Sequence, residues 1–193
     1  GKTTLAAWLL DHLRGRGVEI ELLREPGGVA AAEKVRTLVK DPALTRGAPA
    51  ETLLYAAARP QLVEEALSPV LERGAWVLLD RFVDSSLAYQ GAGRGLGVEL
   101  VRAINDFATG GLAPDRTLLL ELDPALGRAR QGSRLEGFDR LEREEEAFFA
   151  TIAEAYAAPA DAEPERVRRI HASQPAAAVA EQARAAVEDL LHA

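Results

Sequence analysis

Cysteine is absent from the 193 residues, which excludes disulfide bonds, thiolate nucleophiles and cysteine-ligated metals. Methionine is absent too, although a primary translation product begins with one, so we expect that a segment precedes Gly1. No apolar run approaches the roughly 18 residues of a bilayer-spanning helix, and no charged segment followed by an apolar one opens the chain as in a signal peptide. These absences predict a cytoplasmic protein in which only oxygen-ligated ions are plausible.

The residues that are present are typical of one compact soluble domain. Apolar residues make up 48% of the chain and charged residues 27%, with 16 glycines and 10 prolines. The net charge of −7 disfavours a protein that coats nucleic acid, because such binding draws on a positive face and on counterion release. We therefore expect neither a nucleic-acid partner nor a membrane partner, whereas local basic clusters can still bind small polyanions.

Apolar periodicity divides the chain into alternating helices and short strands, without an internal repeat or a linker between domains. Helices are expected over about 5–15, 29–40, 50–73, 84–110, 144–156 and 175–191, with another beginning at Pro124. Strands are expected over 18–23, 76–80, 117–122 and 167–170. Prolines at 60 and 69 should bend the longest helix, and glycines between 91 and 97 should interrupt the next. The alternation predicts a single α/β domain over residues 1–193, with a parallel sheet covered on both faces.

The sequence Gly1-Lys2-Thr3-Thr4 stands directly ahead of an amphipathic helix. It matches the second half of a phosphate-binding loop, in which N–H groups at a helix N-terminus face phosphates, a lysine reaches the β and γ oxygens, and a hydroxyl binds Mg²⁺. Such a triplet also arises by chance, and the alternative is an ordinary lysine beside a threonine helix cap. By itself this motif does not decide between the two.

Two charged motifs follow predicted strands, at the edge of a parallel sheet where ligands collect. They are Arg24-Glu25-Pro26-Gly27-Gly28 and Asp80-Arg81-Phe82. A carboxylate such as Asp80 can hold water on a metal, and an adjacent arginine can grip a phosphate with two hydrogen bonds. The competing interpretations are a turn with a surface ion pair for the first motif and a strand-end salt bridge for the second.

Ser86, Tyr89 and Gln90 fall within about one helical turn and are followed by Arg94. They offer hydroxyl, ring and amide groups for reading a planar base, although such a face is more often merely half-buried. Further on, residues 128–146 are charged and punctuated by glycine. They form either solvated helix ends or a mobile surface lid whose arginines stabilise a transferring phosphoryl group. The three histidines give no support for a Ser-His-Asp triad.

Taken in order, these motifs resemble bacterial thymidylate kinase over essentially the whole chain. The resemblance includes two further pieces, Tyr55-Ala-Ala-Ala-Arg59 and Pro114-Asp115, and ends with Asp139-Arg140-Leu141-Glu142. It implies a P-loop α/β/α kinase fold with a lid at about 128–146. It also implies transfer of the γ-phosphoryl group of ATP to dTMP with Mg²⁺, giving dTDP and ADP, by a cytoplasmic homodimer that serves dTTP synthesis.

On the donor side, the resemblance implies three sets of residues. The nucleotide would be held by Gly1, Lys2, Thr3, Thr4, Arg130 and Gln174. The Mg²⁺ ion would lie at Thr3, Asp80 and Glu142. The groups that act on the transferring phosphoryl would be Lys2, Arg81, Arg134 and Arg140.

On the acceptor side, the resemblance implies a dTMP site formed by Glu25, Pro26, Arg59, Arg81, Ser86, Tyr89 and Gln90. Arg81 would hold the dTMP phosphate, and Arg59 would reach a thymine carbonyl. A thymine-selective site needs partners for the ring carbonyls and N–H, because an unpaired base edge costs about 1–3 kcal/mol, and Arg59 and Gln90 can supply them. No enzyme nucleophile is needed, since the dTMP phosphate oxygen itself attacks.

The sequence departs from the family pattern at a few points. Phe82 stands where tyrosine or histidine is common, and His171 replaces the usual aspartate, so His171 is assigned no role. The family's sheet order is 2-3-1-4-5, and the first strand and half of the phosphate loop are not among these residues. We therefore expect a gap in the sheet and a chain that is unstable or inactive by itself. The alternatives are another nucleoside monophosphate kinase, acting on dUMP, UMP or AMP, a P-loop switch or ATPase, and an inactive nucleotide-binding fragment.

Overall fold

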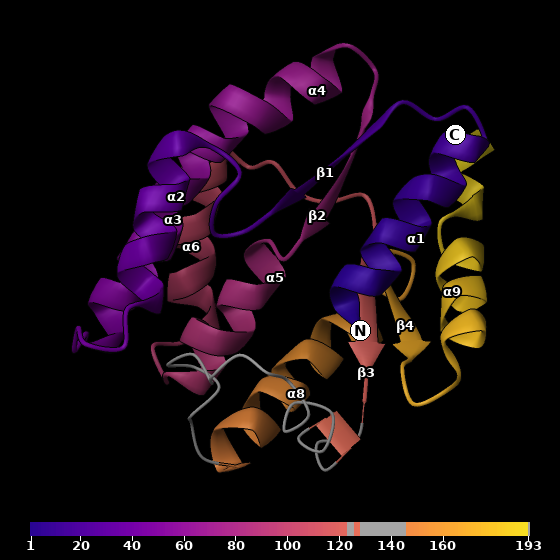
Figure 1. Ribbon diagram of the computed structural model, residues 1–193. Coiled ribbons are helices and arrows are strands. Elements are labelled where there is room, and N and C mark those ends of the chain that lie inside the picture. The colour runs from indigo at the N-terminus through magenta and orange to yellow at the C-terminus, as the bar shows by residue number, and fades with distance from the viewer. Residues whose placement is uncertain (123–125, 128–145, 193) are drawn as a thin grey trace.

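The computed structural model describes residues 1–122, 126–127 and 146–192, and it has the predicted alternation of helices and parallel strands (Figure 1). The strands of these residues are β1 (Ile20–Arg24), β2 (Trp76–Asp80), β3 (Thr117–Glu121) and β4 (Val167–His171). They form two parallel pairs, β1 with β2 and β3 with β4. Within the described part of the chain, the strands thus make two small sheets rather than one.

The register of the first sheet places both strand-end motifs at one edge. Ile20 pairs with Trp76 and Arg24 pairs with Asp80, so β1 and β2 end at the same level. The N–H of Glu25 donates to the Asp80 carbonyl oxygen at 3.0 Å and continues the pairing one residue past β1. Residues that follow β1 and β2 therefore emerge side by side, as expected at the carboxyl ends of parallel strands.

The helices alternate with the strands along the chain. They are α1 (Lys2–Gly15), α2 (Ala30–Lys40), α3 (Ala48–Leu62), α4 (Ser68–Glu72), α5 (Val83–Ser86), α6 (Val98–Thr109), α8 (Glu146–Ala162) and α9 (Ala176–Ala185). Two π-helical segments interrupt this pattern: η1 (Val63–Leu67) joins α3 to α4, and η2 (Leu87–Gly93) continues α5. A 3₁₀ turn, η4 (Glu188–His192), ends the described chain.

The long helix predicted for 50–73 is formed by α3, η1 and α4, which together cover residues 48–72. Pro60 lies inside α3 and has no N–H, so one bond of the helical ladder is missing, and the chain widens into η1 directly afterwards. Pro69 lies in the first turn of α4, where proline is tolerated. The irregularity expected near Pro60 therefore takes the form of a π-helical segment.

Two predicted helix ends are wrong. The helix expected to stop at residue 156 continues as α8 to Ala162, because Ala160 is buried and its packing holds the last turn beyond Pro159. The helix expected over 175–191 ends at Ala185, and η4 follows it. Between α9 and η4, Val187 is buried against Leu9 and Leu13, so tertiary packing and not local periodicity sets the end of α9. The helix expected from Pro124 begins outside the described residues.

The core forms around α1, which packs against both sheets. Leu5 contacts Leu118 and Leu120 of β3 and the buried side of α9. One and two turns later, Leu9 and Leu13 pack with Ile20 of β1 and with apolar residues of β2. Burial of such a leucine contributes about 1.5–3 kcal/mol, so this one apolar stripe holds the two strand pairs in one body.

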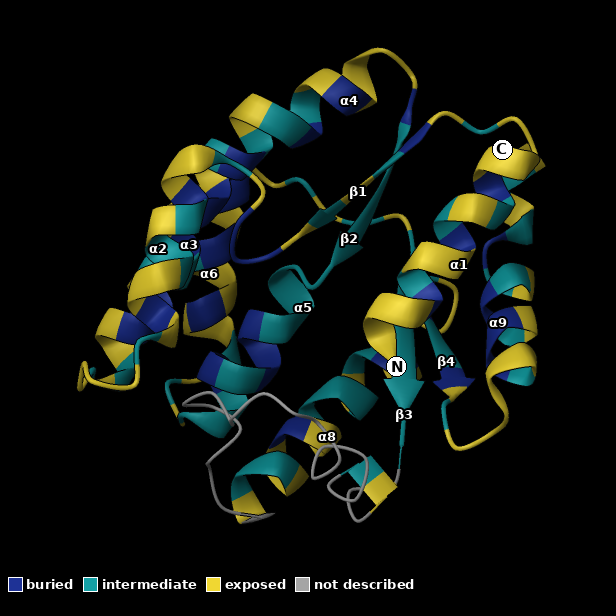
Figure 2. Cartoon of the chain, in the orientation of Figure 1, coloured by how far each residue is buried: buried dark blue, intermediate teal, exposed yellow. Residues whose placement is uncertain are grey.

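A second group of helices, α2, α3 and α6, lies beside the first sheet (Figure 1). Each of these helices has a buried side and an exposed side (Figure 2), and several of the exposed residues are apolar. Leu53 of α3 and Leu100 of α6 are each 57% exposed, and Phe107 of α6 is 90% exposed. Among the helices that the structure describes, none is long and apolar enough to cross a membrane.

Candidate active site

The loop after β1 turns sharply and sends one carboxylate into the interior. Glu25 and Pro26 are buried, while Arg24 and Glu33 form an exposed ion pair at 3.2 Å. Glu33 also accepts from the N–H of Gly28 at 3.0 Å, which ties the loop to the first turn of α2. The surface ion pair proposed as the simpler interpretation is therefore real, but it uses Arg24 and leaves Glu25 for another partner.

That partner is Arg59 of α3, which is only 2% exposed. Its Nε and one terminal nitrogen donate to the Glu25 carboxylate at 2.9 Å and 2.7 Å. Its other terminal nitrogen donates to Ser86 Oγ at 2.9 Å and to Asn105 Oδ1, and a longer contact of 3.3 Å reaches the Phe82 carbonyl oxygen. The guanidinium has five N–H donors, and these acceptors can use all of them.

Four residues from outside α3 thus hold the Arg59 guanidinium in place through hydrogen bonds: Glu25, Phe82, Ser86 and Asn105. Burial raises the pKa of Glu25, and the charge and hydrogen bonds of Arg59 act in the opposite direction without cancelling it. Asn105 is fully buried and donates to the Val101 carbonyl oxygen at 2.6 Å, so its Oδ1 is left to face Arg59. Asn105 had no role in the sequence analysis, because a single asparagine inside an apolar helix pattern carries no signal of its partner.

The motif at the end of β2 bends the backbone sharply. Arg81 has φ of 75°, in the left-handed region that a residue with a side chain rarely adopts. Its guanidinium lies over the Tyr89 ring, with Cζ 5.1 Å from the ring centroid, and it approaches the Tyr89 hydroxyl at 3.5 Å. A strained backbone of this kind costs about 1–3 kcal/mol and is typical of functional sites.

The Tyr89 ring that contacts Arg81 packs in turn against two aromatic rings of α8. Tyr89 meets Phe148 and Tyr156 of α8 edge to face, with centroids 6.2 Å and 6.5 Å apart. Burial raises the pKa of Tyr156, so its hydroxyl stays protonated and donates to Ser85 Oγ at 2.9 Å. The helix that follows the predicted lid segment therefore packs directly on the predicted acceptor site.

Ser86 lies on α5, and Tyr89 and Gln90 lie on the π-helical segment η2. Ser86 and Gln90 are each 2% exposed, whereas Tyr89 is half-buried. Gln90 Nε2 donates to Glu51 Oε1 at 3.1 Å, and Arg94 Nε donates to the same oxygen at 3.3 Å. The half-buried polar face considered as the simpler interpretation is thus mostly interior, with a buried carboxylate behind it.

The first turn of α1 matches the predicted phosphate-facing helix start. Gly1 occupies the capping position, and its carbonyl oxygen accepts from the Leu5 N–H at 3.0 Å. No side chain caps this end of α1, so the threonine-cap alternative is wrong. Lys2, Thr3 and Thr4 are exposed within the first turn, where helix N–H groups and the helix dipole favour an anion.

The donor set suits Mg²⁺. Among the described residues, no group of three or more histidine, aspartate or glutamate side chains could hold a metal alone. Mg²⁺ does not need such a cage, because it keeps water and takes ligands from one or two protein oxygens and from substrate phosphates. The Thr3 hydroxyl and the Asp80 carboxylate are oxygen ligands of this type. Glu142 lies outside the described residues, as do Arg130, Arg134 and Arg140.

The loop between β4 and α9 carries Gln174. Gln182 of α9 accepts from the backbone N–H of His171 at 2.9 Å and approaches Gln174 Oε1 with its Nε2 at 3.5 Å. Gln182 therefore ties this loop to α9, a contact that the sequence analysis did not anticipate. His171 contributes to this contact through its backbone N–H and not through its side chain.

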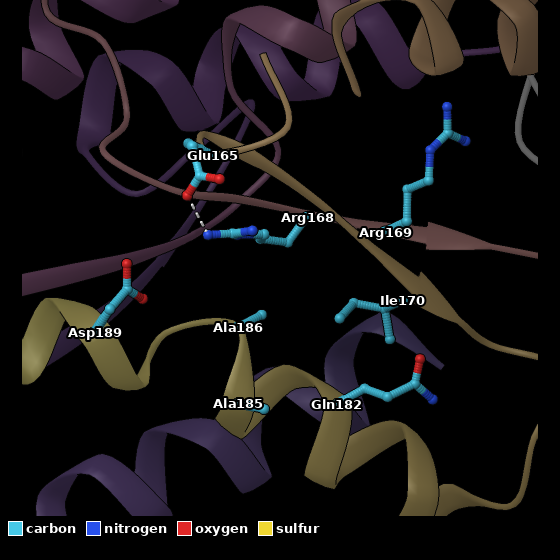
Figure 3. Close-up of a pocket in the computed structure, with 8 residues that line it drawn as sticks. All are labelled: Glu165, Arg168, Arg169, Ile170, Gln182, Ala185, Ala186 and Asp189. Atoms are coloured by element: carbon cyan, nitrogen blue, oxygen red, sulfur yellow. Dashed lines mark hydrogen bonds and ion pairs between the residues drawn. The ribbon is translucent and has the colours of Figure 1, made fainter. Parts of the chain in front are cut away.

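A pocket of about 620 Å³ lies elsewhere, between β4 and α9. Its lining residues, drawn in Figure 3, include none of the predicted site residues. On its β4 side, Arg168 is paired with Glu165 at 2.6 Å (Figure 3). The charged side chains that line this pocket are paired with other residues.

The described residues thus bring the predicted acceptor residues together. Glu25, Arg59 and Ser86 are joined by direct hydrogen bonds, and Arg81 contacts Tyr89, eight residues further along the chain. Gln90 belongs to a second hydrogen-bonded group with Glu51 and Arg94. Lys2 and Thr3, predicted for the donor side, lie at the start of α1.

A Gly-Lys-Thr-Thr helix start in a parallel α/β architecture matches the second half of the phosphate-binding loop, so the fold and this motif indicate the P-loop class of nucleotide-binding proteins. A family model described as thymidylate kinase matches residues 1–183, and the chain belongs to this family. It is 50% identical to the thymidylate kinase of Lactobacillus delbrueckii subsp. bulgaricus over 177 residues, covering 90% of this chain and 84% of the relative.

Other relatives agree. The thymidylate kinase of Halorhodospira halophila is 45% identical over 194 residues, covering 99% of this chain and 90% of its own. That of Deinococcus radiodurans is 48% identical over 175 residues, covering 91% and 84%. The resemblance expected from the motifs is therefore confirmed.

Proposed function

We propose that this protein transfers the γ-phosphoryl group of ATP to dTMP, giving dTDP and ADP, in the cytoplasm. The observation that carries the proposal is the buried group of Glu25, Arg59 and Ser86 beside the strained Arg81. It supplies fixed polar groups for a base next to a cation suited to a phosphate. Membership of the thymidylate kinase family supports dTMP as the acceptor.

Each residue has a role in this proposal. Arg81 grips the dTMP phosphate, and Tyr89 holds the guanidinium in place. Ser86, Gln90 and Arg59 line the base, with Glu25 and Pro26 closing the pocket; Arg59 reaches a thymine carbonyl by giving up its longest bond, to the Phe82 carbonyl oxygen. Such binding fixes the acceptor oxygen in line with the γ-phosphorus, which is where the catalytic advantage of a positioned reaction comes from.

On the donor side, the start of α1 and Lys2 hold the ATP phosphates, and Gln174 lies at the adenine end with Arg130. Mg²⁺, when bound at Thr3, Asp80 and Glu142, neutralises charge on the phosphate oxygens. A dTMP phosphate oxygen attacks, so the protein supplies position and positive charge and no covalent intermediate forms.

A coupled assay of ADP release with ATP, Mg²⁺ and dTMP tests this proposal. We expect dTMP-dependent turnover by the folded full-length protein, and its absence there would contradict the function. The alternative acceptors dUMP, UMP and AMP are compared in the same assay. A preference for one of them over dTMP would favour a related kinase, and ATP hydrolysis without any acceptor would favour a switch or ATPase.

We also propose that the two sheets flank the position of one further strand, in the order 2-3-1-4-5. In this numbering β1 and β2 are strands 2 and 3, and β3 and β4 are strands 4 and 5. Every residue of β2 and β3 is only half-buried, although both strands are largely apolar and would lie inside the sheet in this order. A strand between β2 and β3 would cover these residues and pair their free edges.

In the predicted lid, at about 128–146, Arg134 and Arg140 are proposed to stabilise the transferring phosphoryl group. Replacing both by alanine is expected to lower kcat by about a hundredfold, because fixed cations stabilise charge that develops in the transition state. The KM for dTMP should rise much less, since these arginines do not bind the acceptor. Steady-state kinetics measure both constants, and an unchanged kcat would remove the lid from the mechanism.

The exposed apolar side chains of α3 and α6 support a homodimer. Leu53, Leu100 and Phe107 are all exposed and lie on two helices that pack against each other, and exposed apolar residues that gather on one surface are typical of interaction sites. We expect Phe107→Asp to convert the dimer to a monomer at micromolar concentration in sedimentation or light scattering. Leu126→Asp, at an exposed leucine outside α3 and α6, is the control and should leave the mass unchanged.

A further inference from the structure

Glu51 is among the most deeply buried side chains of the protein, and the proposed function gives it no role. It lies in the first turn of α3 and is 1% exposed. Its carboxylate accepts from Gln90 Nε2 at 3.1 Å, from Arg94 Nε at 3.3 Å and from an Arg94 terminal nitrogen at 3.5 Å. A carboxylate buried to this degree costs free energy unless it is paired, so its contacts must hold it in place.

The chemistry of this contact fixes which way the Gln90 amide faces. A carboxylate paired with a guanidinium can only accept hydrogen bonds, so the amide must turn its NH₂ group toward Glu51. The carbonyl oxygen, Oε1, is then directed away from Glu51. A side-chain amide alone has two nearly equivalent orientations, and the buried acid removes one of them.

Ser86 shows the same principle one helical turn earlier. Arg59 can only donate, and it donates to Ser86 Oγ at 2.9 Å. Because one lone pair of Oγ is taken by Arg59, the hydroxyl proton of Ser86 is left to donate elsewhere. Arg59, a buried cation, thus leaves the Ser86 hydroxyl as a donor. Glu51, a buried anion, leaves the Gln90 carbonyl oxygen as an acceptor.

We infer that Glu51 is a positioning residue that sets the base specificity of the acceptor site through Gln90. This inference rests on the proposed function, in which Ser86 and Gln90 line the base. A donor beside an acceptor matches the edge of thymine, where a ring carbonyl lies next to the N3–H. Cytosine has an unprotonated N3 beside an amino group, so it would place acceptor against acceptor and donor against donor.

The test compares three acceptors in wild type and in Glu51→Gln. A glutamine at 51 can both donate and accept, so Gln90 is free to turn over. We expect kcat/KM for dTMP to fall about tenfold or more, mainly through KM, because the pairing with a buried polar group is lost. The value for dUMP should fall by the same factor, since uracil has the same edge. The value for dCMP should stay constant or rise, so the ratio of dTMP to dCMP falls about tenfold or more.

The chain offers a matched control. Gln61 and Glu65 form another glutamine–glutamate hydrogen bond, but Glu65 is exposed on η1. Glu65→Gln removes the same charge and the same type of bond without touching the site, so it should leave all three acceptors unchanged. A second arm places Glu51→Gln in a Gln90→Ala background, where the ratio of dTMP to dCMP should no longer respond, because the group through which Glu51 acts is gone.

A merely structural role for Glu51 would lower activity with all three acceptors by one factor, and that result would overturn the inference. If Glu51→Gln does not fold, as checked by thermal melting, Glu51→Asp replaces it. Aspartate keeps the charge for Arg94 and withdraws the acceptor from Gln90, so the same selective loss is expected, and equal losses with dTMP and dCMP again overturn the idea. Wild type without dTMP-dependent turnover would instead refute the proposed function, which separates the two failures.

Discussion

Replacing Glu25 by alanine is expected to lower the free energy of unfolding by about 3–5 kcal/mol, one of the two largest effects we expect from any single substitution. The change leaves the Arg59 guanidinium, 2% exposed, without its charged partner, and an uncompensated buried charge is costly. Urea denaturation followed by tryptophan fluorescence measures the difference, with the slope of the transition checked for each variant. Glu19→Ala removes an exposed partner of Arg73 and is the control, with a midpoint close to that of wild type.

The same ion pair leads to a second prediction. Burial raises the pKa of Glu25 despite its partner, so the cost of removing the carboxylate from water is larger than the stabilisation it gains from Arg59. Replacing both residues by leucine should therefore destabilise the protein less than Glu25→Ala alone, although dTMP binding is lost. If the double substitution is instead the more destabilising one, the pair contributes to stability beyond its cost, and its role is not chiefly to position groups for substrate.

The order of elements could be predicted from the sequence, because it depends on local periodicity. The apolar run at 76–80 became β2 with the predicted ends, and the pattern at 29–40 became α2 beginning one residue later. Helix ends set by long-range packing were missed, as where buried Ala160 holds α8 past Pro159. The π-helical form of η2 was missed as well, since spacing alone does not distinguish a wider turn from an ordinary one.

For the candidate site too, some residues could be predicted from the sequence and others depend on long-range packing. The resemblance placed five acceptor residues in one site: Glu25, Arg59, Ser86, Tyr89 and Gln90. The structure joins the first three by hydrogen bonds, places Gln90 in a second hydrogen-bonded group and packs Tyr89 on Arg81. Their partners, Asn105 and Glu51, were not found. Each lies on a helix that carries other polar residues, and only the fold shows that this one faces the interior. Sequence motifs identify groups that face a substrate, whereas the groups behind them are defined by packing.

Arg81 combines strain and function. Its φ of 75° costs free energy that glycine would not incur, yet the position holds an arginine whose guanidinium stacks on Tyr89. The strain is tolerable only if the side chain gains something elsewhere, and stacking on one ring contributes about 0.5–2 kcal/mol. Backbone strain therefore supports the proposal that Arg81 meets a ligand, here the dTMP phosphate.

Arg81→Ala is accordingly expected to lower kcat/KM for dTMP about a thousandfold, because two charge-assisted hydrogen bonds of about 1.5–3 kcal/mol each are lost. Arg81→Gly should lose as much activity while unfolding at higher urea than Arg81→Ala, since glycine relieves the strained φ. Arg102→Ala, at an exposed arginine of α6, is the activity control. Full dTMP kinetics in Arg81→Ala would exclude the phosphate role, and an alanine variant as stable as the glycine variant would show that the backbone there is not strained.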